Sequence, residues 1–220
     1  MKLHKSIQYQ HIIWDWNGTL LNDGWLFVDV MNSILLKRKM KPITLKKYRA
    51  IFGFPVKEYY IKLGFNLEKE SFEACGLEFI NEYEKRRYEA ELYPEVTSIL
   101  TKLQNIGISH SILSAQHQNL LNDLVKHYNI QHYFTQLIGL NNHYAYSKTD
   151  NGLALIKKLK IKSEKILLVG DTDHDFEVAQ AMGIDCFLLN HGHNSLHRLK
   201  KTGTRIFNNF NDLIHFFQID

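Results

Sequence analysis

The sequence has little cysteine and no long apolar run. Its 220 residues include only two cysteines, Cys75 and Cys186, which lie far apart and lack the short spacing of a metal-binding pair. We therefore expect two reduced thiols, and neither a disulfide framework nor a cysteine metal site. No apolar stretch approaches the roughly 18 residues that a membrane-spanning helix needs, and the first ten residues lack the apolar core of a signal peptide. These absences predict a cytoplasmic protein that does not bind a membrane.

The chain also lacks a strong excess of charge of either sign. Its net charge is +4, and its basic residues gather at 37–41 and 46–49. Such runs are typical of solvated helix faces, or of a patch that attracts a small anion. No recognised nucleic-acid-binding motif accompanies them, so we expect no nucleic-acid partner. The length suits one large domain, or a core domain with a smaller insertion.

Apolar periodicity predicts a helical block in the first half of the chain. Residues 9–14 have the composition of a short buried strand. After them the spacing predicts helices at 24–40, from Thr44, near Pro55 and at 68–90. Asn22 or Asp23 is the expected N-cap of the first helix. No segment between 24 and 92 has the pattern of a strand.

Strands and helices alternate from residue 93 onward. The expected strands are 108–113, 136–140, 165–169 and 184–189. The expected helices are 95–105, 117–128, 150–159, 173–182 and 194–201, with a final strand–helix pair after them. This alternation predicts parallel strands joined by right-handed crossovers. The predicted fold is therefore α/β, a doubly wound parallel (Rossmann-like) sheet core of residues 1–22 and 93–220 with an inserted α-helical cap domain of residues 23–92.

Polar side chains follow the predicted strands. Asp15 comes directly after the first strand, Ser114 after the strand 108–113, and Asp171 after the strand 165–169, with Asp175 four residues later. Ligands of open α/β sheets bind at the carboxyl ends of the strands. We therefore expect these side chains to meet at one edge of the sheet.

This set of residue types favours phosphoryl transfer. Clustered carboxylates repel one another and need a cation, and a site made of oxygen ligands suits Mg²⁺. A carboxylate such as Asp15 can act as a nucleophile and form an aspartyl phosphate. Ser114 and Lys148, which precedes a predicted helix, can hold phosphate oxygens, and Gly18 permits a sharp turn whose N–H groups point at an anion.

Each of these residues also has a purely structural interpretation. Ser114 could be an ordinary N-cap and Lys148 an ordinary surface lysine. Thr172 and Asp175 have the spacing of a capping box at the start of a helix. The order in which all of them occur, rather than any one of them, favours a functional site.

That order resembles the haloacid dehalogenase superfamily of hydrolases, and most closely its phosphoglycolate-phosphatase-like branch with a helical cap. The resemblance covers nearly the whole chain. "DWNGTL" from Asp15, "SILSAQ" around Ser114, Lys148 and "LLVGDTDHD" around Asp171 resemble the four motifs of that family in order. "GFPVKEYYIKLG" at 53–64 and "LYPEV" at 92–96 resemble the cap and the return from the cap to the core.

The resemblance implies a magnesium-dependent phosphatase for a small organic phosphate monoester. It makes Asp15 the nucleophile. The magnesium ligands that it implies are Asp15, the backbone carbonyl of Asn17 and Asp171, with Asp175 acting directly or through water. The phosphate-binding residues that it implies are Ser114, Lys148, Gly18 and Thr19. The helical cap would close over the site and select the substrate, in a monomer or a homodimer.

Asn17 departs from the pattern of the family. In the phosphatases that the chain resembles, an aspartate at this position is the general acid/base, a role typically worth about 10²–10⁴ in rate. An amide does not titrate in the useful range, so Asn17 cannot take this role. A working enzyme would need a substitute, for which His117 and the histidines of "HGH" at 191–193 are candidates, or a leaving group that needs no proton.

Two further readings stay open. One is a catalytically weak or inactive relative that binds a phosphorylated ligand or a partner. The other is different carbon chemistry, as in dehalogenases and phosphonatases. Dehalogenases do without magnesium, so the Asp171 and Asp175 pair argues against them. A phosphonatase needs a cap lysine that forms a Schiff base, and Lys57 and Lys62 are the candidates.

Overall fold

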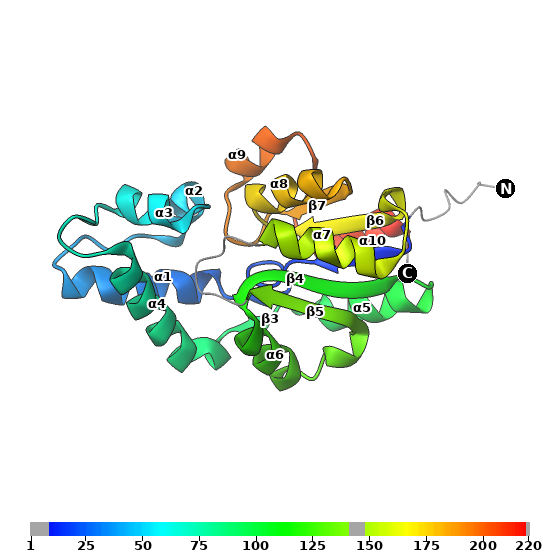
Figure 1. Ribbon diagram of the computed structural model, residues 1–220, viewed down its shortest axis with the longest axis horizontal. Helices are drawn as coiled ribbons and strands as arrows, with labels where there is room; N and C mark the ends of the chain where they lie inside the picture. The colour runs from blue at the N-terminus through cyan, green and yellow to red at the C-terminus, as the bar shows by residue number, and fades with distance from the viewer. Residues whose placement is uncertain (1–8, 141–147, 219–220) are drawn as a thin grey trace.

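A six-stranded parallel sheet forms the centre of the molecule. The computed structural model describes residues 9–140 and 148–218, and Figure 1 shows the sheet and the helices around it. The strand order is β5-β4-β1-β6-β7-β8, and every neighbouring pair is parallel. The strands are β1 (His11–Trp14), β4 (Ser109–His117), β5 (Phe134–Leu140), β6 (Ile166–Gly170), β7 (Asp185–Leu189) and β8 (Arg205–Phe207). This topology confirms the predicted α/β fold class.

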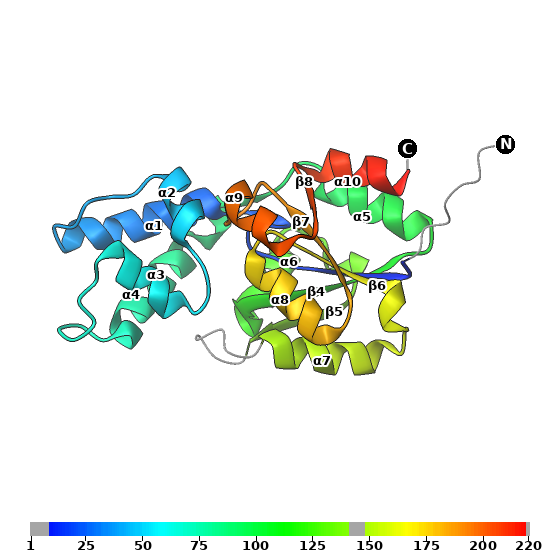
Figure 2. The same ribbon diagram turned by 90° about the horizontal axis from the view of Figure 1, so that it is seen from above.

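Helices cover both faces of the sheet, because the strands carry apolar side chains on both sides. Ile12 and Trp14 of β1 join the larger apolar core, which includes α5 (Val96–Asn105), α6 (Gln118–His127) and α10 (Phe210–Phe217). Ile13, which points the other way, joins the core beneath α7 (Lys148–Leu159), α8 (Asp173–Met182) and α9 (Leu196–Leu199). Figure 2 shows α5 and α10 on one side of the sheet and α7 and α8 on the other.

A layer of four helices lies at one end of the sheet (Figures 1 and 2). The helices are α1 (Gly24–Lys37), α2 (Leu45–Ile51), α3 (Val56–Leu63) and α4 (Phe72–Arg86). Phe27 of α1 packs on Phe79 and Tyr83 of α4, with ring centroids 5.2 and 5.0 Å apart. The apolar core continues from the sheet into this layer. The domain boundaries at residues 22/23 and 92/93 stay a prediction.

A short antiparallel ribbon joins the layer to the sheet, and its second strand, at residues 91–92, corrects the expectation of no strand between 24 and 92. Its strands are β2 (Leu21–Asn22) and β3 (Glu91–Leu92). Two residues are too few to show an alternating pattern. The ribbon forms because the chain segment that leads into the helical layer and the segment that leaves it lie side by side.

Several predicted boundaries shift by a few residues. The long helix starts at Phe72 rather than residue 68, because the Ser71 side chain caps it, and a 3-10 turn at Arg87–Glu89 follows its end. The strand expected at 108–113 continues to His117, so Ser114 lies inside β4 rather than after it. Lys148 is the first residue of α7.

None of the helices within 9–140 and 148–218 is long and apolar enough to cross a bilayer. The first eight residues of the predicted core lie outside the described residues.

His110 of β4 is a completely buried histidine of the core. Its Nδ1 accepts a hydrogen bond from Trp14 Nε1 at 3.2 Å, and its Nε2 lies 3.3 Å from the Leu100 carbonyl. Burial lowers the pKa of His110 from 6.5 to about 4. Between these two values the unfolded chain binds more protons than the folded chain. The stability that His110 contributes is therefore complete above pH 6.5 and is lost as the pH falls toward 4.

We expect the free energy of unfolding to fall on acidification through this window. His110→Gln should reduce the slope by up to about 1.4 kcal/mol per pH unit, the value for one proton. Urea unfolding at several pH values between 4.5 and 7.5 measures the slope. His132→Gln, at an exposed histidine, is the matched control and should change it far less. Equal slopes for the wild type and His110→Gln would contradict the prediction.

Candidate active site

Three buried carboxylates meet at the carboxyl edge of the sheet. Asp15 follows β1 and Asp171 follows β6. These strands are neighbours, and the Asp15 N–H donates to the Val169 carbonyl at 2.9 Å. Asp175 lies in the first turn of α8. One oxygen from each of the three carboxylates lies within 4.8 Å of the other two. The sheet therefore brings together the three acidic residues that the sequence singled out.

Lys148 is the cation of this cluster. Its Nζ donates to Asp15 Oδ1 at 2.5 Å and to Asp175 Oδ1 at 2.6 Å, and the side chain is 3% exposed. Burial alone would lower the pKa of Lys148, but Asp15 and Asp175 raise it, so the ammonium stays charged. The interpretation of Lys148 as an ordinary surface lysine is therefore wrong.

The cluster has more negative than positive charge. Burial raises the pKa values of Asp15 and Asp171, with Lys148 opposing the shift at Asp15 and His193 opposing it at Asp171. Burial acts in the same direction on Asp175, but Lys148 outweighs it and holds the pKa below its usual range. Three buried carboxylates with one ammonium leave a negative excess that a divalent cation would offset, and oxygen donors suit Mg²⁺. The residues present fit such an ion.

The three carboxylates are not equally free to bind a metal. Asp175 Oδ2 accepts from the N–H groups of Asp171 and Thr172 and from the Thr172 hydroxyl. Thr172 in turn caps α8 in a capping box, so the structural interpretation of this pair is confirmed. Thr19 Oγ1 lies 2.7 Å from Asp171 Oδ1 and 3.3 Å from Asp15 Oδ2. Asp15 and Asp171 are thus the better candidates for direct metal contact. Asp175 instead holds Lys148 and the turn at residues 171–172 by hydrogen bonds.

Gly18 shapes the loop after β1. It has a φ of +77°, and its N–H donates to the Leu21 carbonyl at 2.8 Å and to Asp23 Oδ1 at 2.9 Å. A Cβ at this position would lie 2.5 Å from Asp171 Oδ2, so no other residue fits. The N–H of Gly18 is therefore used inside the protein, and Thr19 is completely buried among the carboxylates.

Ser114 is 1% exposed inside β4, and its Oγ accepts from the Gln116 N–H at 3.0 Å. The wall of the adjoining pocket on this strand is formed by Ala115, Gln116 and His117. The described contacts of Ser114 thus do not include the carboxylate cluster.

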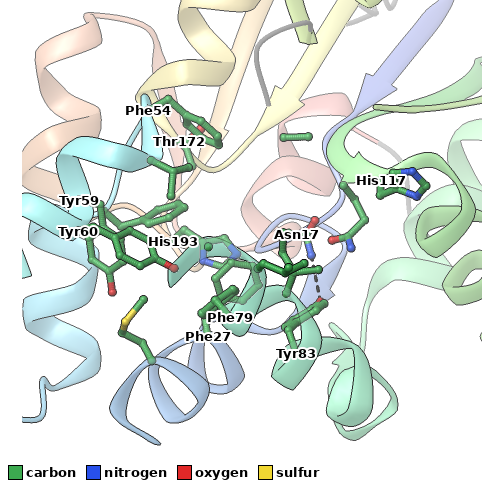
Figure 3. Close-up of a pocket in the computed structure, with 18 of the residues that line it drawn as sticks. Asn17, Phe27, Phe54, Tyr59, Tyr60, Phe79, Tyr83, His117, Thr172 and His193 are labelled. Atoms are coloured by element: carbon green, nitrogen blue, oxygen red, sulfur yellow. Dashed lines mark hydrogen bonds between the residues drawn. The ribbon is translucent and has the colours of Figure 1, made fainter. Parts of the chain in front are cut away.

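Asn17 belongs to a buried polar network that sequence reasoning missed. Its Nδ2 donates to Asp23 Oδ2 at 2.7 Å and to the Tyr83 hydroxyl at 3.2 Å, the second bond being visible in Figure 3. The Tyr83 hydroxyl donates to Asp23 Oδ2 at 3.0 Å. On the other side, His193 Nε2 lies 3.1 Å from Asp23 Oδ1 and its Nδ1 lies 2.7 Å from the Tyr48 hydroxyl. Asp23 therefore holds the amide of Asn17 in place.

This arrangement corrects the role expected for Asp23. Asp23 occupies the N-cap position of α1, but its side chain makes no capping hydrogen bond. The backbone N–H of His193 also donates to Asp171 Oδ2 at 2.5 Å. The "HGH" segment is therefore part of the site, as its position after a core strand suggested. Nothing in the helical spacing of Tyr48 or Tyr83 marks their hydroxyl groups for this network.

The other candidate histidines and lysines differ in position. His117 lines the pocket. The ring of His191 stacks on Tyr93 at 3.8 Å, and burial lowers the pKa of His191 to about 4. Lys57 and Lys62 are exposed on α3, and neither is among the described residues that line the pocket beside Asp15.

A pocket of about 410 Å³ lies between the helical layer and the carboxylate cluster. Asp15, Asn17, Lys148 and His193 line the end toward the sheet. Aromatic side chains of the helical layer line the rest, and Figure 3 shows Phe27, Phe54, Tyr59, Tyr60 and Phe79 around it. A small molecule held in this pocket would touch both the carboxylates and the helical layer.

A family model described as haloacid dehalogenase-like hydrolase matches residues 12–189. Phosphoglycolate phosphatase 1 of Pseudomonas aeruginosa is 24% identical over 212 residues, covering 92% of this chain and 78% of that protein. The phosphoglycolate phosphatase of Aliivibrio fischeri is 29% identical over 108 residues, covering 48% of this chain and 47% of that protein.

Solved structures show the same fold. A haloacid dehalogenase-like hydrolase from Streptococcus pneumoniae superposes with a TM-score of 0.83 at 19% identity, over 96% of this chain and 99% of that one. Protein tyrosine kinase A of Mycobacterium tuberculosis gives a TM-score of 0.81 at 20% identity, over 96% and 99%. At such identities the likeness concerns the fold alone. Since the family model covers most of the chain, the protein belongs to the haloacid dehalogenase-like hydrolases and is a hydrolase of their phosphatase type.

Proposed function

We propose that the chain is a magnesium-dependent phosphatase that hydrolyses a small organic phosphate monoester through an aspartyl phosphate on Asp15. The observation that carries the proposal is the position of Asp15, a buried carboxylate that lines the pocket and contacts Lys148 at 2.5 Å. The phosphoglycolate phosphatases among the relatives are in accord with this reaction type.

In the first step, an Asp15 oxygen attacks phosphorus and the bond between phosphorus and the ester oxygen breaks. The released oxygen takes up a proton. In the second step, water attacks the aspartyl phosphate, which releases inorganic phosphate and restores the Asp15 carboxylate. Mg²⁺, when bound, offsets the negative charge of the carboxylates and of the phosphate oxygens.

Individual residues take the following roles in this proposal. Asp15 and Asp171 would hold the metal together with the backbone carbonyl of Asn17, and Asp175 holds Lys148 and the turn after β6. Lys148 neutralises the phosphate as it approaches Asp15. Ser114 has a phosphate-binding role in this proposal by the family resemblance alone, because its side chain is buried and is not among the described residues that line the pocket. Gly18 and Thr19 act by shaping the loop and positioning the carboxylates, because their N–H and hydroxyl groups are already engaged there. We also propose that the protein is a cytoplasmic monomer or homodimer.

A second candidate is a weak or inactive relative that binds a phosphorylated ligand or a partner. The hydrogen bond from Asn17 to Asp23 favours it, because this bond places an amide where an acid/base would act. This candidate predicts ligand binding without turnover.

Metal removal distinguishes the two candidates. Purified protein with Mg²⁺ should hydrolyse p-nitrophenyl phosphate. Chelation with EDTA should lower the rate about tenfold or more, because Lys148 would then be the only cation against three carboxylates and the incoming phosphate among the described residues of the cluster. Excess Mg²⁺ should restore the rate.

Circular dichroism of the chelated protein is the control for folding. Folded protein that binds phosphate but turns over no member of a broad panel of phosphate esters would support the binding candidate instead.

A further inference from the structure

We infer that the substrate is an aryl phosphate, a phosphate ester whose leaving group is an uncharged aromatic alcohol. The inference rests on the proposed function and assigns the substrate class of the same site. Two independent features of the pocket carry it: the chemistry of its wall in the helical layer, and the absence of a proton donor at residue 17.

The wall opposite the carboxylates is aromatic and apolar. Its rings come from all four helices of the layer and from the segment between α2 and α3, and they include Phe27, Phe52, Phe54, Tyr59, Tyr60 and Phe79. They pack edge-on to one another, as Phe52 does on Tyr59 at 5.3 Å and an interplanar angle of 81°. Such a wall favours an aromatic ring in the ligand, by burial of apolar area and by edge-to-face contacts.

The described lining of the pocket holds no second lysine or arginine that could pair with another anionic group on the substrate. Among the described residues that line it, Lys148 is the only lysine or arginine, and two carboxylates already hold it. His193 is held by Asp23 and Tyr48, and His117 lies on the sheet side in Figure 3. The two charged residues that the helical layer adds to the lining are acidic, Glu73 and Glu84.

No lysine or arginine of the helical layer is among the described residues that line the pocket. Arg38 pairs with Glu70 and Glu78, and Lys37 pairs with Glu78 at 2.9 Å. A carboxylate on the substrate, as in phosphoglycolate, would therefore lie against aromatic rings and glutamates without a partner, which is unfavourable. The substrate named for the relatives thus does not fit the chemistry of this wall.

The leaving group gives the second argument. Asn17 donates both of its described hydrogen bonds within the protein, and its amide has no proton to give to a leaving oxygen. An aryl oxide is a far weaker base than an alkoxide, since a phenol has a pKa of about 10. It therefore departs with less need for a general acid. The same class of ester suits the wall and the residue at position 17.

Binding of phosphonates that cannot be hydrolysed tests the inference without turnover. With Mg²⁺ present, calorimetry should give a Kd for benzylphosphonate about tenfold or more below the Kd for phosphonoacetate, because the ring gains apolar burial and the carboxylate has no partner. Phosphonoacetate binding as tightly as benzylphosphonate would overturn the inference. So would tighter binding of a phosphonate that carries a trimethylammonium group, whose cation the rings and glutamates could instead attract.

Leu77 of α4 offers a matched pair of variants. It lines the pocket and is 53% exposed, so its replacement should not disturb folding. Leu77→Arg supplies the missing cation and should improve phosphonoacetate binding about tenfold, whereas Leu77→Gln should not. If both variants behave alike, the lack of a cation is not what excludes a carboxylate.

Hydrolysis is measured separately, with 2-naphthyl phosphate, phosphoglycolate and glycerol phosphate. Selective binding of benzylphosphonate without hydrolysis of any ester would overturn the proposed phosphatase activity and leave the ligand class standing. Hydrolysis with preference for phosphoglycolate would support the proposed phosphatase activity and contradict the inference that the substrate is an aryl phosphate.

Discussion

Replacing Asp15 by asparagine is expected to lower kcat/KM for p-nitrophenyl phosphate by roughly 10³-fold or more, because the variant keeps the shape of the side chain but loses the nucleophile. In the wild type the carboxylate lies 2.5 Å from Lys148 Nζ and lines the pocket. An amide at this position cannot form the acyl phosphate, and it also removes one of the two charges that hold the lysine.

Folding should survive this substitution. Burial raises the pKa of Asp15, which shows that its charged form is disfavoured in the folded protein. A neutral amide of equal size should therefore leave the unfolding temperature unchanged or slightly higher. Thermal unfolding of Asp15→Asn followed by circular dichroism tests this part of the prediction.

Asp173→Asn is the matched control. Asp173 lies between Asp171 and Asp175 in sequence, but its carboxylate accepts from Arg198 Nη2 at 2.6 Å and takes no part in the cluster. Its loss should change kcat/KM by no more than about twofold. If Asp15→Asn kept turnover within about tenfold of the wild type, Asp15 would not be the nucleophile and the covalent mechanism would fail.

Local sequence patterns were sufficient for the parts of the site that depend on the chain near one strand. An apolar run followed by Asp15, and another followed by Asp171, predicts two strands that end in carboxylates. The parallel pairing of β1 with β6 then brings the carboxylates together. Lys148 was recognised only by its order in the chain, since its burial depends on Asp15 and Asp175, which come from elsewhere in the fold.

Features decided by distant partners escaped the sequence patterns. Asp23 has the local signature of an N-cap. Its carboxylate instead makes hydrogen bonds with Tyr83 and His193, which lie 60 and 170 residues away in the sequence. Ser114 was expected after a strand that ends at 113. Pairing of β4 with β5 carries the strand to His117, with a register irregularity in between. Helical periodicity puts Phe79 and Tyr83 on one face of α4, but it does not tell that this face lines a pocket.

Asn17→Asp is expected to speed hydrolysis of alkyl phosphates such as glycerol phosphate by at least about tenfold, within the 10²–10⁴ range that general acid/base catalysis supplies. The alkoxide is a strong base and gains most from a proton donor. Hydrolysis of p-nitrophenyl phosphate, whose leaving group needs little protonation, should change by less than about threefold. The measured quantity is the ratio of kcat for the two esters, wild type against variant.

The structure adds a condition to this expectation, because the new carboxyl would face Asp23. In the wild type, Asn17 Nδ2 lies 2.7 Å from Asp23 Oδ2. Two carboxyl groups at such a distance cannot both be ionised readily, so they share one proton. A shared proton keeps the new group in the acid form that the first step requires.

Asn17→Ser removes the bond to Asp23 without adding an acid, so it separates the release of Asp23 from the gain of a proton donor. It should leave the ratio near that of the wild type. A gain in Asn17→Ser equal to that in Asn17→Asp would show that release of Asp23, and not a proton donor at residue 17, limits the wild type.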